Sequence, residues 1–202
     1  MSPRDWGPLV IVKPTVGSLS LGVELRMTDE VRYRVPLTYP QGHPGRLGQM
    51  MAQKFVDPGP HAARIRVLTL FSEPLYAEEI KVAEASPRPE VFNSETIKAI
   101  TITTVKSKER IRSFVYDSDV LDLARKTFRL FPDVPLHACD LIREWDTGKL
   151  FILEVNPGGN TWHFSSKGGI RESVGGKKRH EQFNAFELAA DLLIERTRKE
   201  AR

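Results

Sequence analysis

The sequence predicts an α+β fold, because blocks of strand-like residues are combined with two amphipathic helices and no internal repeat occurs. The clearest strand signal is a pair of apolar runs, 136–143 and 150–156, on either side of a turn at 146–148. The clearest helix signals are residues 119–131, with acids in the first turn and basic residues later, and residues 182–199, which place apolar side chains on one side. An antiparallel sheet packed against helices is therefore expected.

Composition excludes several classes of protein. The chain has 202 residues, 40% hydrophobic and 28% charged, which is typical of a folded domain and not of a disordered chain. No run approaches the ~20 apolar residues of a membrane span. The single Cys139 excludes a disulfide framework and a cysteine-rich zinc site, and the polar N-terminus is no signal peptide. We expect a cytoplasmic protein that does not bind a membrane.

The elements of the first part of the chain are short strands and loops. Residues 9–12 are an apolar run stopped by Pro14, which favours a buried strand, and residues 23–26 alternate like a second strand. A small-residue loop, 17–22, separates them, and prolines and glycines between 36 and 48 favour loops. Residues 50–56 are mostly apolar. The turn cluster 57–60 follows, so we predict two domains, 1–58 and 59–202.

The second part contains a hairpin, a further strand and the helices. Residues 64–71 and 75–82 predict a hairpin around 72–74, and residues 83–95 predict a surface loop. The β-branched residues 100–105 predict a strand. If it continues, four cations share one face: Lys106, Lys108, Arg110 and Arg112. The helix at 119–131 is expected to begin after an N-cap at Ser118 and to stop at Pro132.

Positive charge is concentrated in two segments. Residues 96–113 and residues 167–180 each hold five basic residues and one acid, whereas the whole chain carries +4. This distribution favours an anion site over a generally basic protein, with two solvated surface stretches as the alternative. No aromatic platform is interleaved with the basic residues, so nucleic-acid binding is not expected.

The hairpin from 136 to 156 carries the chemistry. If it turns about Thr147, Asp140 lies opposite Glu154, and Asn156 projects from the same face. The expected companions on that face are Ala138, Ile142, Leu150 and Ile152, and the reverse face carries Cys139, Leu141, Phe151, Leu153 and Val155. Two facing carboxylates require neutralisation. A Mg²⁺ ion held by these oxygens, local Lys or Arg side chains, or exposure at a sheet edge would each provide it.

Two loops add to this site. The strand ends in a glycine loop running from Glu154 to Asn160, whose N–H groups would form a nest for an oxyanion or phosphate. Lys13 stands at the end of a buried strand, just before the loop 17–22. That loop lacks the Lys-Ser/Thr of a P-loop, so alone it is weak evidence.

The order and spacing of these motifs resemble the ATP-grasp superfamily, the ATP-dependent carboxylate–amine or carboxylate–thiol ligases. The resemblance rests on Val12-Lys13-Pro14, on the loop 17–23, on residues 52–56 and on the hairpin with Asp140 and Leu153-Glu154-Val155-Asn156-Pro157. It covers roughly residues 9–195. It implies a remnant of a small β-rich N-terminal lobe at 1–58 and a larger lobe of antiparallel sheet and helices at 59–202.

The resemblance also implies a site. Lys13 is expected to bind the phosphates and assist catalysis, together with Arg66, Arg143 and Asn160. The nucleotide would contact the mobile loop through Ser18, Ser20 and Gly22, and adenine would contact Gln53, Lys54, Phe55 and Val56. The metal ligands are expected to be Asp140, Glu154 and Asn156, holding Mg²⁺ with Mn²⁺ as a substitute. Trp162 and His163 would line the acceptor pocket, with aromatic loop packing as the alternative.

Three departures from the family pattern qualify the activity. Only twelve residues precede Lys13, which leaves no room for a preceding domain or a first nucleotide lysine. No acid precedes Arg66 in its strand. Ala138 stands where several ligases carry an arginine, so that role is absent or taken by Arg143, Lys106 or Arg112.

Two functions are therefore expected. The first is a ligase that forms an acyl phosphate from ATP and a small carboxylate or peptide substrate, with the basic segments clamping phosphates or an acidic substrate. The second is a truncated, non-catalytic nucleotide-binding module that a homo-oligomer or an N-terminal partner chain would complete. The truncation predicts weak ATP binding and little turnover by the isolated chain.

Overall fold

The computed structural model describes residues 1–16, 19–105, 109–157, 162–174, 176 and 178–201. They form two compact units, each described by itself. The first unit is Met1–Ala62 with Val82–Arg110, and the second is Ala63–Lys81 with Ile111–Arg202. Residues 82–110 thus belong to the first unit although they follow the boundary predicted after residue 58. The roles assigned to the two predicted domains stay predictions.

The first unit is built on a three-stranded antiparallel sheet in the order β2-β1-β3. Its helices and strands are α1 (Pro3–Trp6), β1 (Leu9–Pro14), β2 (Glu24–Met27) and β3 (Met50–Lys54), with one-turn 3-10 helices η1 (Thr28–Glu30), η2 (Pro36–Thr38), η3 (Pro44–Arg46) and η4 (Thr96–Ala99). The predicted strands at 9–12 and 23–26 are confirmed. Leu9 and Val10 are buried, as the apolar run required.

The register of β1 divides its side chains between two faces. Lys13 lies opposite Met51, and Ile11 lies opposite Gln53, so Lys13 and Gln53 share one face. Val12 lies opposite Glu24 in β2 and therefore belongs to the other face.

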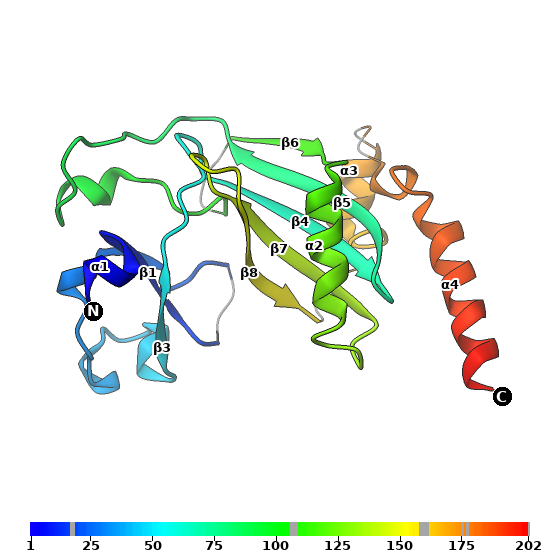
Figure 1. Ribbon diagram of the computed structural model, residues 1–202, viewed down its shortest axis with the longest axis horizontal. Coiled ribbons are helices and arrows are strands. Elements are labelled where there is room, and N and C mark those ends of the chain that lie inside the picture. Colours follow the sequence, from blue (N-terminus) through cyan, green and yellow to red (C-terminus); the bar gives the residue numbers. More distant parts are fainter. Residues whose placement is uncertain (17–18, 106–108, 158–161, 175, 177, 202) are drawn as a thin grey trace. The chain divides into compact units, whose positions relative to one another are not determined.

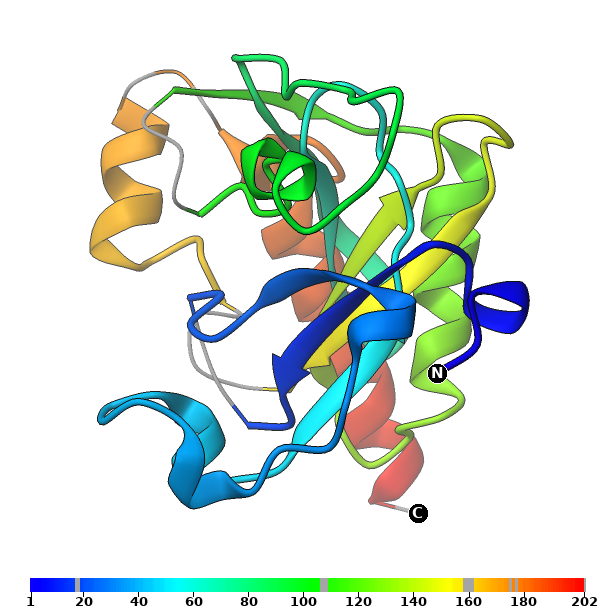
Figure 2. The same ribbon diagram turned by 90° about the vertical axis from the view of Figure 1, so that its left-hand side faces the viewer.

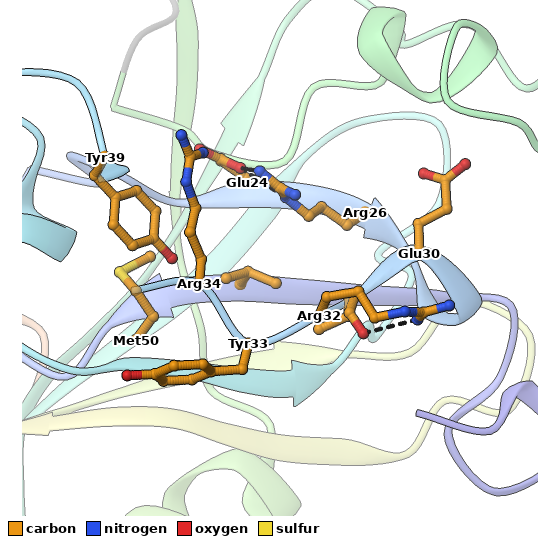
Figure 3. A pocket seen from close by; sticks show the side chains of 10 residues that line it. Glu24, Arg26, Glu30, Arg32, Tyr33, Arg34, Tyr39 and Met50 are labelled. Carbon is orange, nitrogen blue, oxygen red and sulfur yellow. Dashed lines mark hydrogen bonds and ion pairs between the residues drawn. The ribbon is translucent and has the colours of Figure 1, made fainter. Parts of the chain in front are cut away.

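The segment between β2 and β3 consists of turns and short helical pieces, as its prolines and glycines predict (Figure 2). Its first residues are anchored by Thr28, which is fully buried and donates its hydroxyl to the Gly7 carbonyl at 2.7 Å. A cavity of about 210 Å³ lies between this segment and the sheet (Figure 3).

The second unit is built on a five-stranded sheet in the order β6-β5-β4-β7-β8 (Figure 1). Its strands are β4 (Ala63–Leu70), β5 (Glu73–Val82), β6 (Arg110–Phe114), β7 (Leu136–Arg143) and β8 (Leu150–Asn156). Its helices are α2 (Ser118–Phe128), α3 (Lys167–Val174) and α4 (Ala185–Glu200), with the one-turn η5 (Arg179–Glu181). The predicted α+β class and antiparallel pairing are confirmed.

Hydrophobic layers cover both faces of this sheet. On one face, Val120 and Ala124 of α2 pack against Val67 and Cys139. On the other face, Ala185 and Ala189 at the start of α4 pack with Leu68, Tyr76 and Ala138. Burial on both sides explains why β4 and β5 are apolar at most positions near their shared turn.

The hairpin of β4 and β5 is confirmed, but its turn lies one residue earlier than predicted. Phe71 and Ser72 form the two-residue connection, and both have positive φ, 48° and 78°. A two-residue turn with positive φ at both positions matches the twist of a hairpin. Pro74 lies inside β5, where the pairing with β4 is irregular between Leu68 and Thr69, a place where a strand tolerates proline.

Two element predictions need correction. The predicted strand 100–105 is wrong: the N–H groups of Thr101 and Val105 bind the hydroxyls of Ser86 and Thr103 instead of a neighbouring strand. The strand of this region is β6, which contains Arg110 and Arg112; Lys106 and Lys108 lie outside the described residues. The helix predicted at 119–131 runs from Ser118 to Phe128, with Asp117 and not Ser118 at the N-cap. It ends three residues earlier than predicted, so Pro132 does not mark its last turn.

None of the helices in the described part of the chain combines the length and the apolar character needed to cross a membrane.

Candidate functional site

The strands β7 and β8 begin and end at the predicted residues, 136–143 and 150–156. Asp140 pairs with Glu154, and Ala138 pairs with Asn156. Asp140, Glu154 and Asn156 therefore lie on one face of the sheet, as the spacing predicts. The sequence folds this way because the turn residues 144–149 separate two apolar runs of matched length.

A bulge in β8 corrects the face assignment nearer the turn. The register shifts after Asp140, so that Leu141 pairs with Ile152 and Leu153 is the extra residue of β8 at the bulge. One extra residue exchanges the faces of the residues beyond it. Phe151 lies on the Asp140 face, opposite Ile142, whereas Leu150 and Ile152 lie on the reverse face, where Leu150 packs into the core.

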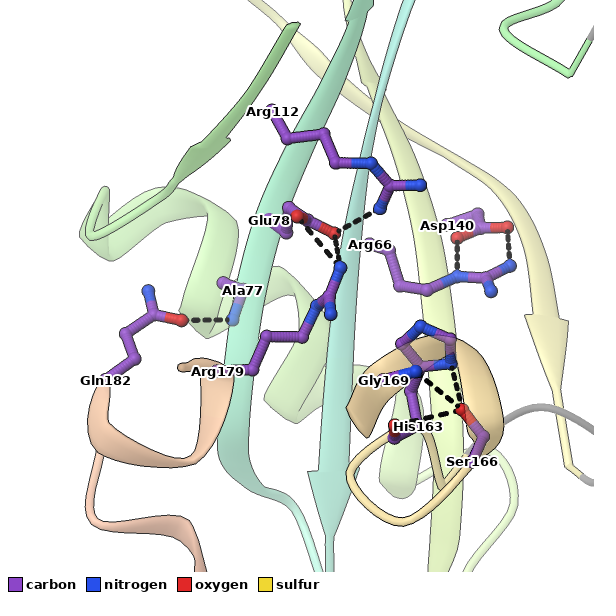
Figure 4. Close-up of polar contacts among 10 residues, drawn as sticks. All are labelled: Arg66, Ala77, Glu78, Arg112, Asp140, His163, Ser166, Gly169, Arg179 and Gln182. Atoms are coloured by element: carbon purple, nitrogen blue, oxygen red, sulfur yellow. Dashed lines mark hydrogen bonds and ion pairs between the residues drawn. The ribbon is translucent and has the colours of Figure 1, made fainter. Parts of the chain in front are cut away.

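Asp140 is neutralised by two arginines of β4. The guanidinium of Arg66 donates from Nε to Oδ1 and from NH2 to Oδ2, both at 2.7 Å (Figure 4). Arg64 adds a third bond from NH1 to Oδ2 at 2.8 Å. The geometry follows from the sheet, because Arg66 lies directly opposite Asp140 and Arg64 follows on the same face. Of the predicted alternatives, local arginines hold Asp140.

The two carboxylates differ in their surroundings. Asp140 is only 1% exposed, whereas Glu154 is exposed on β8, the edge strand of the sheet. Burial acts to raise the pKa of the Asp140 carboxyl, but the hydrogen bonds and charges of Arg66 and Arg64 outweigh it and hold the pKa below its ordinary value. The pKa of Arg66 is raised: burial opposes this shift, and the Asp140 contact overcomes it.

This contact predicts acid sensitivity. Because the pKa of Asp140 is depressed in the folded state, its ionised form stabilises the protein above the ordinary carboxyl range, and this stability is lost as the pH falls through the folded pKa. Urea unfolding of the wild type and Asp140→Asn should show a gap in free energy of unfolding at pH 6 that narrows by pH 3. A gap of equal size at both values would contradict this. The exposed Asp146→Asn, in the same hairpin, is the control.

The carboxylate oxygens of Asp140 and Glu154 fit a Mg²⁺ ion that arrives with anionic ligands of its own. Asn156 Nδ2 lies 3.2 Å from Glu154 Oε1 and 3.5 Å from Asp140 Oδ2, so the three side chains meet. Oδ2 of Asp140 accepts bonds from both arginines, whereas Oδ1 accepts a bond from Arg66 alone of the two. Two carboxylates face two guanidiniums, and the described residues contain no cluster of three acids, histidines or cysteines suited to a metal. The set fits a cation that brings its own anionic ligands, as Mg²⁺–nucleotide does.

A second charge cluster brings the two basic segments together. Glu78 of β5 accepts two bonds from Arg179, at 2.9 and 3.0 Å, and one from Arg112 at 3.0 Å (Figure 4). Glu78 and Arg179 are 4% and 3% exposed. Glu78 was not among the predicted site residues, and its signal in the sequence is an acid on the same face of β5 as the apolar Tyr76 and Ile80.

The loop before α3 is fixed by local contacts. Ser166 Oγ accepts the Gly169 N–H at 3.0 Å and lies 3.1 Å from His163 Nδ1 (Figure 4). A Cβ on Gly169 would stand 1.7 Å from the His163 carbonyl oxygen, so only glycine fits. Trp162 packs edge-to-face on Phe164, with ring centroids 4.8 Å apart. Trp162 therefore packs with an aromatic neighbour, as the second of its two predicted roles states.

The remaining predicted residues are placed as follows. In the first unit, Lys13 and Gln53 share a face, Lys54 projects from the opposite face, Phe55 donates its N–H to Leu9, and Val56 is buried. Ser20 and Gly22 lie in the turn before β2, both with positive φ. Ser18 and Asn160 lie outside the described residues.

Arg143 lies apart from Asp140. Arg143 comes three positions after Asp140 in β7, so its side chain projects from the opposite face of the sheet, which α2 covers. Asp117 and Asp119 bind it at 3.2 and 2.7 Å. Its contact with Asp119, with a smaller opposing effect of burial, raises the pKa of Arg143. Arg143 therefore does not face Asp140.

Comparison with known proteins gives the fold. No family model and no curated protein matches the sequence. Among solved structures, the D-alanine–D-alanine ligase of Bacillus anthracis matches with a TM-score of 0.54 and 16% identity, over 98% of this chain and 58% of the ligase. D-cycloserine synthetase DcsG matches with a TM-score of 0.49 and 21% identity, over 85% of this chain and 55% of that one.

A third match is the ATP-grasp ligase PsnB in complex with a minimal precursor, Mg and ADP, with a TM-score of 0.48 and 12% identity over 87% of this chain and 48% of that one. The fold assignment rests on the first of the three. This chain has a partial ATP-grasp fold and spans 58% of the length of the Bacillus anthracis ligase. At this identity the similarity concerns the fold alone.

Proposed function

We propose that this chain binds Mg²⁺–ATP and takes part in an ATP-dependent carboxylate–amine or carboxylate–thiol ligation through an acyl phosphate. The observation that carries the proposal is the register of β4, β7 and β8, which aligns Arg66, Asp140 and Glu154 across one face of an ATP-grasp sheet. Asn156 lies beside these carboxylates, with its Nδ2 donating to Glu154 Oε1 at 3.2 Å, and its amide oxygen would serve as the third metal ligand.

The residues of the second unit have separable roles in this proposal. Bound Mg²⁺ would supply charge that offsets the phosphates. Asp140 Oδ1, Glu154 and Asn156 would hold it, while Arg66 keeps Asp140 ionised and oriented through its two bonds. Arg64 has a single bond to Asp140 and is 24% exposed, so a phosphate oxygen can replace that carboxylate as its acceptor.

The first unit would supply the nucleotide contacts. Lys13 and Gln53 project from one face of its sheet, which supports a shared ligand for the two side chains. The Lys13 ammonium would compensate phosphate charge, and the backbone of residues 53–56 would bind the adenine edge.

A second candidate is nucleotide binding without ligation. Two observations favour it. The buried Ala138 stands at the position where several ligases carry an arginine, and Arg143 is bound to Asp117 and Asp119 on the other face of the sheet. ADP release with a panel of carboxylates and amines separates the two candidates.

The test of the proposal is a thermal-shift titration with Mg²⁺–ATP. At a nucleotide concentration of ~100 Kd, binding to the folded state should stabilise the wild type by about 2.7 kcal/mol, and the melting temperature should rise by roughly 5–10 °C. Glu154→Ala should remove this rise, because it deletes one of two carboxylate ligands at an exposed position. Asp146→Ala, in the same hairpin and exposed, should leave it unchanged.

Lys13→Ala tests the first unit in the same titration. Loss of a charge-assisted phosphate contact should weaken ATP binding by about ten- to a hundredfold and leave adenosine binding alone. Lys13→Arg should restore ATP binding only in part, because the planar fork replaces a compact ammonium.

Two outcomes would contradict the proposal. Equal stabilisation of the wild type and Glu154→Ala by Mg²⁺–ATP would refute the metal site. Equal weakening of ATP and adenosine binding by Lys13→Ala would refute the role of the lysine.

A further inference from the structure

The cavity of the first unit lies on the sheet face that does not carry Lys13. It is lined by Val12, Glu24 and Arg26, which share one face of β1 and β2, and by Met50, which pairs with Pro14 and belongs to the same face. Lys13 and Gln53 project from the opposite face. The cavity is therefore separate from the proposed nucleotide contacts, and its ligand is independent of that proposal.

The outer wall of the cavity is held in place by packing. The ring of Tyr39 stacks on His43, with centroids 4.6 Å apart and planes at 10°. A Cβ on Gly45 would lie 2.9 Å from the Tyr39 ring, so a glycine is needed for this close approach. Arg46 donates to the carbonyls of Leu37 and Tyr39 at 3.2 and 2.8 Å. These contacts fix the wall before any ligand binds.

The charges in the cavity favour an anion. Three arginines and two glutamates line the cavity: Glu24 is bound by Arg26, whose Nε lies 2.8 Å from Oε2, and Glu30 accepts the Ser94 hydroxyl. Arg32 and Arg34 donate only to backbone carbonyls and to the Thr38 hydroxyl, and neither forms an ion pair with any carboxylate of the described residues. Two guanidinium groups at one cavity thus keep their charge available, and planar guanidiniums bind carboxylate and phosphate oxygens well.

Two tyrosines line the same cavity, and Tyr39 lies beside the Arg34 guanidinium (Figure 3). Tyr33 is 87% exposed, and the Arg34 guanidinium lies over the Tyr39 ring, 4.6 Å from its centroid. Met50 adds a polarisable apolar surface between them. A volume of about 210 Å³ accommodates one ring with a small anionic substituent.

We propose that this cavity binds a small anionic molecule with one planar ring, its negative charge compensated by the guanidiniums of Arg32 and Arg34 and its ring placed against Tyr33. The site has no part in the ligation and lies on the other face of the sheet from Lys13. The ring and the charge are both required, since the cavity presents aromatic side chains and guanidiniums together.

Calorimetry with four probes tests the proposal on the full chain. Phenyl phosphate and benzoate combine the ring with an oxyanion and should bind. Inorganic phosphate and benzyl alcohol each lack one part and should bind at least tenfold more weakly. The double variant Arg32→Gln with Arg34→Gln should weaken phenyl phosphate at least tenfold. Arg4→Gln, an exposed arginine of the same unit, and Lys13→Ala should leave it within twofold.

Tyr33→Ala supplies a second variant that does not threaten folding, because its ring is exposed. It should weaken phenyl phosphate and benzoate but leave inorganic phosphate unchanged. The proposal is overturned if no ring-bearing anion binds at millimolar concentration, if benzyl alcohol binds as well as benzoate, or if Lys13→Ala weakens phenyl phosphate as much as the double variant does.

Discussion

Glu78→Ala should lower the free energy of unfolding by about 3–5 kcal/mol, because it removes the carboxylate that accepts two bonds from the buried Arg179 guanidinium. Both side chains are almost fully buried, at 5% and 3% exposure, and they share two hydrogen bonds. The Arg112 bond to Glu78 is lost at the same time. The removal of one member of a buried ion pair costs more than the pair contributes, since the remaining charge is desolvated.

Urea unfolding measures this effect, and two comparisons make it specific. Glu79→Ala, at the next position of β5 and only half-buried, should change stability far less. The double variant Glu78→Gln with Arg179→Met removes both charges and should recover part of the loss. If Glu78→Ala and Glu79→Ala cost the same, the cluster does not stabilise the sheet.

Arg66→Ala should lower the free energy of unfolding by about 3 kcal/mol, near the lower end of the range for a broken buried pair. Two bonds of 2.7 Å to Asp140 are lost, and the carboxylate remains buried with only the Arg64 contact. Arg66→Lys keeps the charge and loses the planar fork, so it should recover only part of this stability.

A double-mutant cycle with Asp140→Asn measures the pairing directly. In that background Arg66→Ala should cost less by about 1–3 kcal/mol, because the two side chains are in contact. Arg64→Ala serves as the comparison within β4, since it removes a single bond and is expected to cost less. Additive losses for Arg66→Ala and Asp140→Asn would show that the bidentate contact contributes nothing.

The β7–β8 hairpin could be predicted to the residue because its information is local. Two apolar runs of similar length flank one turn, and their pairing fixes Asp140 opposite Glu154. The bulge at Leu153 could not be predicted, because nothing in the local pattern marks an extra residue, and it exchanged the faces of Leu150 and Phe151.

The partner of Asp140 depended on a pairing that local sequence does not contain. Arg66 lies 74 residues before Asp140 in the chain, and only the register of β4 with β7 brings them together. The sequence required some neutralising group and left its identity open. Likewise, the β-branched run 100–105 has strand propensity, but its N–H groups find hydroxyl partners, so tertiary context overrode propensity.

The chain passes between the two units three times, after residues 62, 81 and 110. Neither unit is therefore a continuous stretch of polypeptide: 82–110 completes the first unit, and it interrupts the second between β5 and β6. During synthesis, β4 and β5 leave the ribosome before their neighbours β6 and β7 have been made. The five-stranded sheet is therefore completed only after the interrupting segment has emerged. Gene fusions or truncations that cut after residue 62 would separate the first unit from its own later segment, and the order of synthesis ties the maturation of one unit to that of the other.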